Sequence, residues 1–244
     1  MDLGLQGKKA IVCAASKGLG RACAISLARE GVELVITART AATLEETAAE
    51  IRQMTGVKVT AVAGDITSEA GRTAALAACP APDIVVNNNG GPPRGDFREW
   101  DREMWIKAVD ANMLAPIFLI KAVIDGMIER KFGRIVNISS MTGQTPNFGQ
   151  ANYAASKGGV MAFTKVVALE MARYNITANV VSPGYTATEM LLSIPTDILD
   201  AVKAKIPMGR LGLPEEIAKA VAYLVCDGDY VTGQQIAVNG GMYM

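Results

Sequence analysis

Seven short runs of apolar and β-branched residues recur along the 244-residue chain. Longer stretches with apolar residues at helical spacing separate these runs. Because the runs are apolar at most positions, they are typical of parallel strands covered on both faces. The alternation predicts one α/β domain, 1–244, with a doubly wound, mostly parallel, seven-stranded sheet and helices on both faces. The expected strands are 8–14, 33–38, 58–64, 83–88, 133–139, 176–182 and 234–240, and the expected helices are 18–31, 43–54, 68–79, 101–130, 153–174 and 214–226.

Composition supports a single domain and narrows the class of partner. Half of the residues are hydrophobic, which is enough for one sizeable core. Lys and Arg together number 24, as do Asp and Glu, and no basic stripe is present, so nucleic acid is a poor candidate partner. The start, MDLGLQGKK, has no cationic region followed by an apolar stretch. No uninterrupted apolar run reaches about 18 residues, so we expect a soluble cytoplasmic protein with no membrane partner.

The chain contains no histidine, which excludes several common kinds of active site. Ser-His-Asp and Cys-His catalysis and HExxH zinc sites all require that residue. The cysteines Cys13, Cys23, Cys79 and Cys226 form no CxxC pair. We therefore expect reduced, mostly buried thiols and no metal site, and an enzyme of this sequence must move protons with another residue.

One segment carries candidates for chemistry on a carbonyl group. Ser140 follows the expected strand 133–139, and Tyr153 and Lys157 stand thirteen and seventeen positions further on. Residues four apart share a helix face, so Tyr153 and Lys157 can serve one site. An ammonium about 4 Å away favours the phenolate by roughly 4 kcal/mol, which predicts a Tyr153 pKa near neutrality. Tyr153 is then the general acid or base, and Ser140 a second donor to the same oxygen.

The first turn, CAASKGLG, joins the first expected strand to a helix and suits a phosphate. Free amides at a helix N-terminus bind anions, and Gly18 and Gly20 permit close approach. A P-loop is disfavoured, because no Gly-Lys-Ser/Thr follows. Arg39 stands just after the second expected strand, where a NAD site usually has an acidic residue. With Lys17, its guanidinium suits a 2′-phosphate; the alternative is that both cations are merely solvated.

Together these features resemble the classical short-chain dehydrogenase/reductase family, which has a Rossmann-type fold, over essentially the whole chain. NNNG at 87–90 is similar to the family's Asn-Asn-Ala-Gly element, SPGYTAT at 182–188 to its carboxamide-fixing segment, and VTGQQIAVNGG to its last strand. The resemblance implies a catalytic tetrad of Asn112, Ser140, Tyr153 and Lys157, with Asn112 helping to hold a water that relays protons. It also implies an NADP(H) cofactor, or NAD(H), in contact with Ser16, Lys17, Gly18, Leu19, Gly20, Arg39, Asp65, Ile66, Asn87, Asn88, Gly90, Tyr153, Lys157, Pro183, Gly184, Thr186 and Thr188.

Three residues depart from the family's pattern. Ala14 stands where the first glycine of the turn is usual, and an alanine in left-handed geometry costs roughly 1–2 kcal/mol. Asn89 replaces the alanine of Asn-Asn-Ala-Gly, and Thr186 stands where an apolar residue is commoner. All three bear on the seating of the cofactor, and none belongs to the tetrad.

The substrate is less clearly encoded. The stretch 186–206 is expected to form a lid, and its residues Met190, Leu191, Leu192 and Ile194 form either an apolar wall for substrate or part of the core. The family resemblance suggests a homotetramer through the two long helices. The leading hypothesis is an NADPH-preferring carbonyl reductase that also works as an alcohol dehydrogenase. A 3-oxoacyl thioester (ACP or CoA) reductase is the alternative, and a non-catalytic NADP-binding sensor is disfavoured by the intact tetrad.

Overall fold

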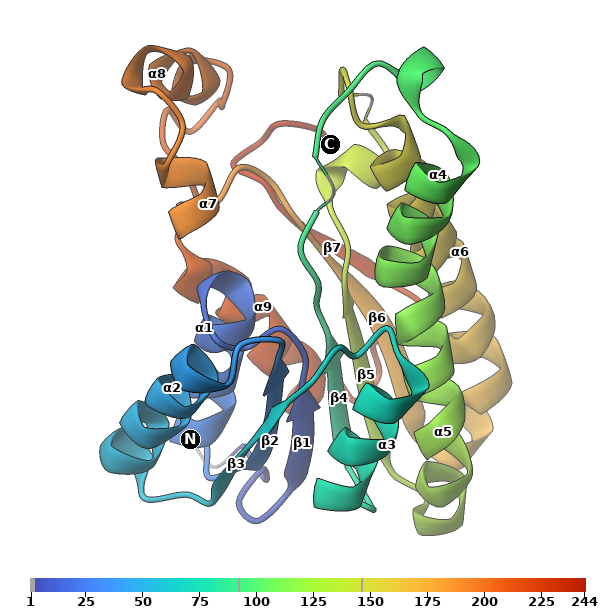
Figure 1. Cartoon of the computed structure of the whole chain (residues 1–244). Helices are drawn as coiled ribbons and strands as arrows, with labels where there is room; N and C mark the ends of the chain where they lie inside the picture. Colours follow the sequence, from blue (N-terminus) through green and yellow to red (C-terminus); the bar gives the residue numbers. More distant parts are fainter. Residues whose placement is uncertain (1–2, 92, 146) are drawn as a thin grey trace.

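The computed structural model describes residues 3–91, 93–145 and 147–244. Within them, seven parallel strands form one sheet in the order β3-β2-β1-β4-β5-β6-β7 (Figure 1). The predicted doubly wound α/β fold is confirmed, and each expected strand ends within two residues of the observed one. The strands are β1 Lys9–Val12, β2 Glu33–Ala38, β3 Val59–Ala63, β4 Ile84–Asn87, β5 Gly133–Ile138, β6 Ile176–Pro183 and β7 Gln235–Val238.

The helices form a layer on each face of the sheet. Successive strand residues point to opposite faces, so Val12 of β1 joins the core beneath one layer and Ile11 the core beneath the other. The first layer holds α1 Gly18–Arg29, α2 Ala41–Thr55 and α9 Pro214–Val225. The second holds α3 Glu69–Ala78, α4 Arg102–Val109, α5 Ala115–Arg130 and α6 Ala151–Met171. Short 3-10 turns occur at Phe97–Glu99, Met141–Gly143 and Ala172–Tyr174.

The helix expected at 101–130 contains a change of pitch. A π-helical turn, Asp110–Leu114, joins α4 to α5, so the long helix is continuous but locally widened. By length and composition alone, Arg102–Arg130 is apolar enough to cross a membrane. A third of its most apolar stretch is buried inside the protein, including Leu119 and Met127, which belong to the second core.

All seven strands are parallel, so their carboxyl ends reach the same edge of the sheet. The order reverses beside β1, which pairs with both β2 and β4, and ligands of doubly wound sheets bind at such a point. Figure 1 shows α7 Glu189–Leu192 and α8 Thr196–Ala204 above α1, with α4 on the other side of this edge. The stretch expected as a lid, 186–206, therefore contains two short helices beside the crevice.

Candidate active site

Ser140, Tyr153 and Lys157 meet at the carboxyl edge of β5. Ser140 is the N-cap of the turn Met141–Gly143, and its hydroxyl accepts a hydrogen bond from the amide of Thr142 (3.2 Å). Tyr153 and Lys157 lie one turn apart on α6. The side chain of Ser140 is close enough to Tyr153 to lower the pKa of its phenol. The structure thus brings the hydroxyls of Ser140 and Tyr153 together, so both can face one substrate oxygen.

Lys157 is only 3% exposed, and its Nζ donates a hydrogen bond to the carbonyl of Ile138 (2.8 Å). Nζ lies 5.6 Å from the centre of the Tyr153 ring. Burial lowers the pKa of Lys157 to about 8, because the ammonium loses hydration. Burial likewise raises the pKa of Tyr153, and the effect of Ser140 offsets only part of this. The expectation of a Tyr153 pKa near neutrality is therefore wrong, since desolvation of the phenolate dominates.

Asn112 lies in the π-helical turn and is 1% exposed. Its Nδ2 donates to the carbonyl of Ala108 (3.0 Å), whereas its Oδ1 has no hydrogen-bond partner among the described residues. A cavity of about 10 Å³ adjoins it, and Lys157 lines the same cavity. That volume is about what one water molecule needs, and an unpaired buried acceptor is a suitable partner for it. The site fits the water-holding role expected of Asn112.

Two glycines of the turn after β1 have separate structural reasons to be glycine. A Cβ on Gly20 would lie 2.3 Å from the carbonyl oxygen of Ala14, and Gly18 has φ +57°. Ala14 itself has φ +49°, so the expected left-handed alanine is confirmed. Lys17 is the N-cap of α1 and makes no side-chain capping bond. The Lys17 side chain therefore leaves the first amides of α1 uncapped. These amides lie at the edge of the sheet where a phosphate is expected.

The two cations expected at the cofactor differ in their surroundings. Arg39 follows β2, is exposed, and makes no hydrogen bond or ion pair with the part of the chain that the structure describes. Lys17 Nζ lies 3.7 Å from Oε2 of Glu189 on α7, and both side chains are largely exposed. An exposed pair of this kind is weak. Ser16 lies between this turn and α2, where its carbonyl accepts a hydrogen bond from Thr47 Oγ1 (3.0 Å).

The next predicted contacts lie on the loops after β3 and β4. Asp65 accepts hydrogen bonds from the amide and hydroxyl of Thr67 (3.0 and 2.8 Å), which fixes the loop that also carries Ile66. Asn88 Nδ2 lies 3.4 Å from the carbonyl oxygen of Ala14 and ties the β4 loop to the glycine turn. Gly90 follows on the same loop and is exposed. Leu19, on α1, is partly buried against the core.

Asn87 belongs to a buried polar chain that sequence reasoning did not find. Its Nδ2 donates to Asn137 on β5 (2.8 Å), and Asn137 donates to Thr164 on α6 (2.9 Å). These hydrogen bonds join two strands to α6, the helix that carries Lys157. They also engage the side chain of Asn87, which was predicted to contact the cofactor. The available signal was an asparagine inside each of two otherwise apolar strand runs, because buried amides require partners.

The segment after β6 connects that strand to the glycine turn. Pro183 ends β6, and Gly184 packs so closely on Asn239 that a Cβ would lie 2.7 Å from it. Thr186 is buried and donates to the carbonyl of Gly184 (3.2 Å). Thr188 caps α7, and its methyl carbon lies 3.5 Å from where a Cβ on Gly18 would be. These residues bring the lid against the turn that begins α1.

The two helices of the lid are exposed, whereas Thr186 and Ile206 at its two ends are buried. No residue of α7 or α8 is buried, and Met190 and Leu192 are 66% and 54% exposed. Met190 and Leu192 therefore lie outside the core, whereas Leu191 and Ile194 are partly buried. An apolar lid beside the reactive groups suits a partly apolar substrate.

The cysteines lie outside this chemistry. Cys13, Cys23 and Cys79 are buried free thiols, and Cys226 is partly exposed. Burial raises the pKa of Cys13 and Cys23 to about 12, which makes them unreactive at neutral pH. Across the described ranges, no group of three or more His, Cys, Asp or Glu side chains is arranged to hold a metal ion.

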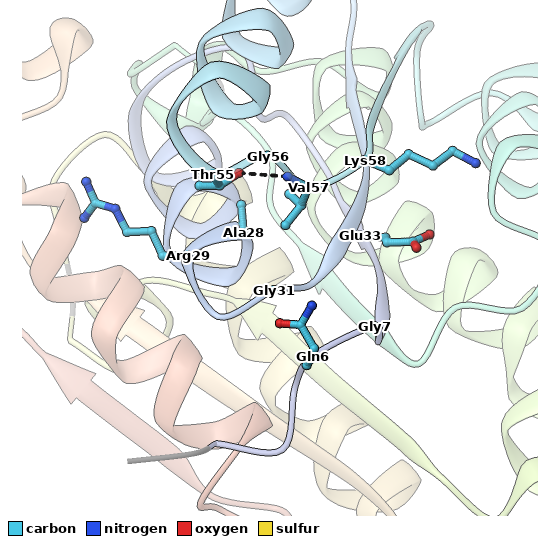
Figure 2. A pocket seen from close by; sticks show the side chains of 10 residues that line it. All are labelled: Gln6, Gly7, Ala28, Arg29, Gly31, Glu33, Thr55, Gly56, Val57 and Lys58. Carbon is cyan, nitrogen blue, oxygen red and sulfur yellow. Dashed lines mark hydrogen bonds between the residues drawn. The ribbon is translucent and has the colours of Figure 1, made fainter.

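A separate hollow of about 380 Å³ lies at the opposite edge of the sheet (Figure 2). It is formed where α1 and α2 end and where β2 and β3 begin, and Arg29 and Lys58 point away from each other at its sides. The hydrogen bond drawn across it joins the amide of Val57 to Thr55 Oγ1 (3.4 Å). The reactive groups are at the other end of the strands, so this hollow is not part of the candidate site.

Comparison with known proteins identifies the family. Residues 13–243 match the family model described as Enoyl-(Acyl carrier protein) reductase. The chain is 40% identical over 247 residues to the 3-oxoacyl-[acyl-carrier-protein] reductase FabG of Pseudomonas aeruginosa, covering 99% of this chain and 100% of that protein. The chain belongs to the classical short-chain dehydrogenase/reductase family. As a short-chain dehydrogenase/reductase, it is an oxidoreductase.

Two further similarities span different substrates. This short-chain dehydrogenase/reductase chain is 47% identical over 171 residues to the acetoacetyl-CoA reductase of Acinetobacter sp., a match covering 70% of this chain and 69% of that protein. The structure of this chain also resembles that of L-sorbose reductase from Gluconobacter frateurii complexed with NADPH and L-sorbose. That match has a TM-score of 0.94 at 29% identity and covers 99% of this chain and 98% of the other.

Proposed function

We propose that this protein is an NADP(H)-dependent carbonyl reductase in which Asn112, Ser140, Tyr153 and Lys157 form the catalytic tetrad. The observation that carries the proposal is the placement of Ser140 and Tyr153 together beside the buried Lys157, at the carboxyl edge of the sheet. Two hydroxyls next to a buried cation can stabilise the negative charge that develops on the oxygen of a carbonyl group during its reduction. A protein that only bound nucleotide would need none of this, which argues against a sensor.

The cofactor side of the crevice fits a dinucleotide phosphate. The first amides of α1, which the Lys17 side chain leaves uncapped, provide donors for the pyrophosphate, and Gly18 and Gly20 keep side chains out of its way. Arg39, free of partners among the described residues, and Lys17, in a weak exposed pair, provide charge for a 2′-phosphate. Thr188 and the other contacts named from the sequence complete the proposed set. The NADPH in the L-sorbose reductase complex supports the same cofactor here, with NAD(H) as the weaker one.

Each catalytic residue has a distinct task in the proposed reduction. When bound, NADPH supplies the hydride that adds to the carbonyl carbon. Ser140 and Tyr153 hydrogen-bond the carbonyl oxygen, and Tyr153 donates its proton as negative charge develops there. Lys157, charged below a pKa of about 8, stabilises the phenolate that remains. Asn112 Oδ1 holds a water beside Lys157, through which Tyr153 regains a proton. The raised pKa of Tyr153 keeps the phenol protonated at neutral pH, which is the state that donates a proton in reduction.

A second candidate narrows the substrate to 3-oxoacyl thioesters of ACP or CoA. The reductases of Pseudomonas aeruginosa and Acinetobacter sp. carry such substrates in their names, and one matches this chain over nearly its full length. The exposed apolar lid suits an acyl chain as well as a simple ketone. A panel of acetoacetyl thioesters, aryl ketones, diketones and ketoses, followed by loss of NADPH absorbance, separates the two candidates.

The molecular context is proposed on the same basis. The chain is one domain, 1–244, with a substrate lid at 186–206, and it works in the cytoplasm as a homotetramer. Apolar side chains remain exposed on the two long helices, namely Met104, Ile106, Phe118, Val166 and Leu169. An exposed apolar face of this kind suits another copy of the chain, and the small-molecule substrate needs no nucleic acid or membrane partner.

Replacing Tyr153 with phenylalanine tests the function directly. Tyr153→Phe removes the proton donor and leaves the ring, so we expect turnover of the best ketone to fall by at least about a hundredfold. NADPH binding, measured by fluorescence titration, should be kept. Tyr174→Phe, in the 3-10 turn that follows α6, is the matched control. Unchanged turnover in Tyr153→Phe would refute the mechanism, and cofactor binding without turnover of any panel member in the wild type would favour the sensor.

A further inference from the structure

Asn89, the residue that departs from the family's Asn-Asn-Ala-Gly element, connects two parts of the site. It lies on the loop after β4, and its Nδ2 donates a hydrogen bond to the carbonyl of Ala111 (2.8 Å). Its Oδ1 accepts from the amide of Gly90 (2.9 Å), which fixes the orientation of the side chain. An alanine at this position could make neither bond. The β4 loop is therefore tied to the π-helical turn that carries Asn112.

The carbonyl of Ala111 needs a donor from outside its own helix. In a π-helical turn the carbonyl of one residue accepts from the amide five positions later. For Ala111 that position is Pro116, which has no amide hydrogen. The amide of Ala115, the next candidate, is bound to the carbonyl of Asp110. A carbonyl without a partner in this partly buried position is costly, and Asn89 supplies the bond.

We propose that Asn89 is a positioning residue that holds the π-helical turn and thereby aims Asn112 at the cavity beside Lys157. The inference rests on the proposed function, since it assigns a residue to the same proton path. One cavity of about 10 Å³ is lined by Asn89, Asn112 and Lys157. A small displacement of the π-helical turn would therefore move Asn112 relative to Lys157. In this chain the Asn89 side chain thus holds the π-helical turn in place, which an alanine at the same position could not do.

The effect of losing this bond has a definite sign. Tyr153 is the titratable group next to Lys157, whereas β4, the π-helical turn and β5 present only amides, carbonyls and apolar groups to the cavity. Asn112 Oδ1 favours the charged ammonium, directly or through a water, because an acceptor stabilises a cation. If the turn shifts away, Lys157 loses its proton at lower pH. The alkaline limb of the rate profile then moves to lower pH.

Two variants separate the bond from the shape of the side chain. Asn89→Asp has the same size and keeps the acceptor for Gly90, but it places an oxygen where the donor to Ala111 was. Asn89→Ala restores the residue usual in the family and removes both bonds. Asn175→Asp is the matched control, because Asn175 Nδ2 also donates to a backbone carbonyl, that of Lys131 (3.0 Å), on the surface away from the site.

The decisive experiment combines hydrogen exchange with the pH dependence of kcat. We expect Asn89→Asp to speed amide exchange in a peptide spanning 109–116, to lower kcat about tenfold and to move the alkaline limb to lower pH. Asn89→Ala should show smaller changes of the same sign, and Asn175→Asp none. The Kd for NADPH, measured by fluorescence titration, should stay within about twofold, because Asn89 acts through the turn.

Three results would overturn the proposal. Unchanged exchange in 109–116 would mean that Asn89 does not hold the turn. Faster exchange with an unaltered pH profile would leave Asn89 with a structural role only. A large loss of NADPH affinity with unchanged kcat would make it a cofactor contact. Failure of the proposed function is distinguishable, since the wild type would then reduce no ketone or thioester while hydrogen exchange still tests the tether.

Discussion

At the scale of single residues, burial controls the chemistry more than charge pairing does. The spacing of Tyr153 and Lys157 predicted a lowered Tyr153 pKa, yet both groups are desolvated, and each is pushed toward its neutral form. For Tyr153 this means a phenol that keeps its proton at neutral pH. For Lys157 it means a charge that is lost close to pH 8 rather than above pH 10. The site is thus arranged to give a proton to a substrate.

This burial predicts how the rate depends on pH. We expect kcat for ketone reduction to be level below about pH 8 and to fall about tenfold per unit above it, as Lys157 loses its charge. Stability should respond in the opposite sense. The folded pKa of Lys157 lies below its unfolded value of 10.5, so the unfolded chain binds more protons between about pH 8 and 10.5. The contribution of Lys157 to the free energy of unfolding therefore rises with pH in that window.

Kinetics and thermal unfolding between pH 6.5 and 9.5 check this prediction together. If kcat falls with rising pH while the melting temperature stays constant, the fall reports the titration of Lys157 in the active site. A rate that falls only where the melting temperature also falls would indicate alkaline unfolding and contradict the assignment to Lys157.

Arg39 determines the expected choice of cofactor. Its guanidinium is exposed beyond β2 without a partner among the described residues, so it is available to a 2′-phosphate. Arg39→Asp should lower kcat/KM for NADPH by about ten- to a hundredfold and leave that for NADH nearly unchanged, because a charge-assisted bond contributes about 1.5–3 kcal/mol. Arg29→Asp, an exposed arginine at the far end of α1, is the control. Equal losses with both cofactors would contradict the phosphate assignment.

At the scale of elements, the lid and the long helix add features that periodicity does not reveal. The lid contains two helices with no buried residue, so the apolar side chains of these helices contribute little to the core. The π-helical turn widens the long helix where Asn112 faces the cavity. One extra residue in a turn hardly alters the apolar pattern, so periodicity does not show where the helix widens.

The exposed lid predicts a separation of binding from stability. Met190→Ser should raise KM for an apolar ketone several-fold and leave the melting temperature within about 2 °C, because Met190 is 66% exposed. Met54→Ser, a methionine on α2 that is 45% exposed, should change neither the KM nor the melting temperature. A clear fall in melting temperature for Met190→Ser would show that the lid residue packs in the fold after all.

At the scale of the whole molecule, the two long helices offer an apolar face that one chain leaves uncovered. Leu169 on α6 is 82% exposed, and Phe118 on α5 is 46% exposed. Exposed apolar side chains on neighbouring helices favour association, although single exposed residues are common.

Leu169→Glu should therefore weaken the proposed tetramer. Light scattering during gel filtration should give the mass of four 25.7 kDa chains for the wild type and a smaller assembly for the variant. Met54→Glu, on a helix of the opposite layer, should leave the wild-type mass unchanged. A monomeric wild type would contradict the tetramer without affecting the proposed chemistry.

The sequence by itself determined the sheet, the helices and the residue types of the site. Runs such as DIVVNN and GRIVNIS are buried on both faces and must be parallel strands, and the spacing of Tyr153 and Lys157 places both on one helix face. These inferences hold because local periodicity and the crossover rules of parallel sheets leave few alternatives.

The tertiary structure alone decided how those groups are placed and charged. The bond from Asn89 to Ala111 joins residues 22 positions apart, and Asn87, Asn137 and Thr164 meet from three elements. The pKa values of Tyr153 and Lys157 follow from burial, which depends on everything that surrounds them. Desolvation and long-range hydrogen bonds are properties of the packed molecule, and no local pattern in the chain encodes them.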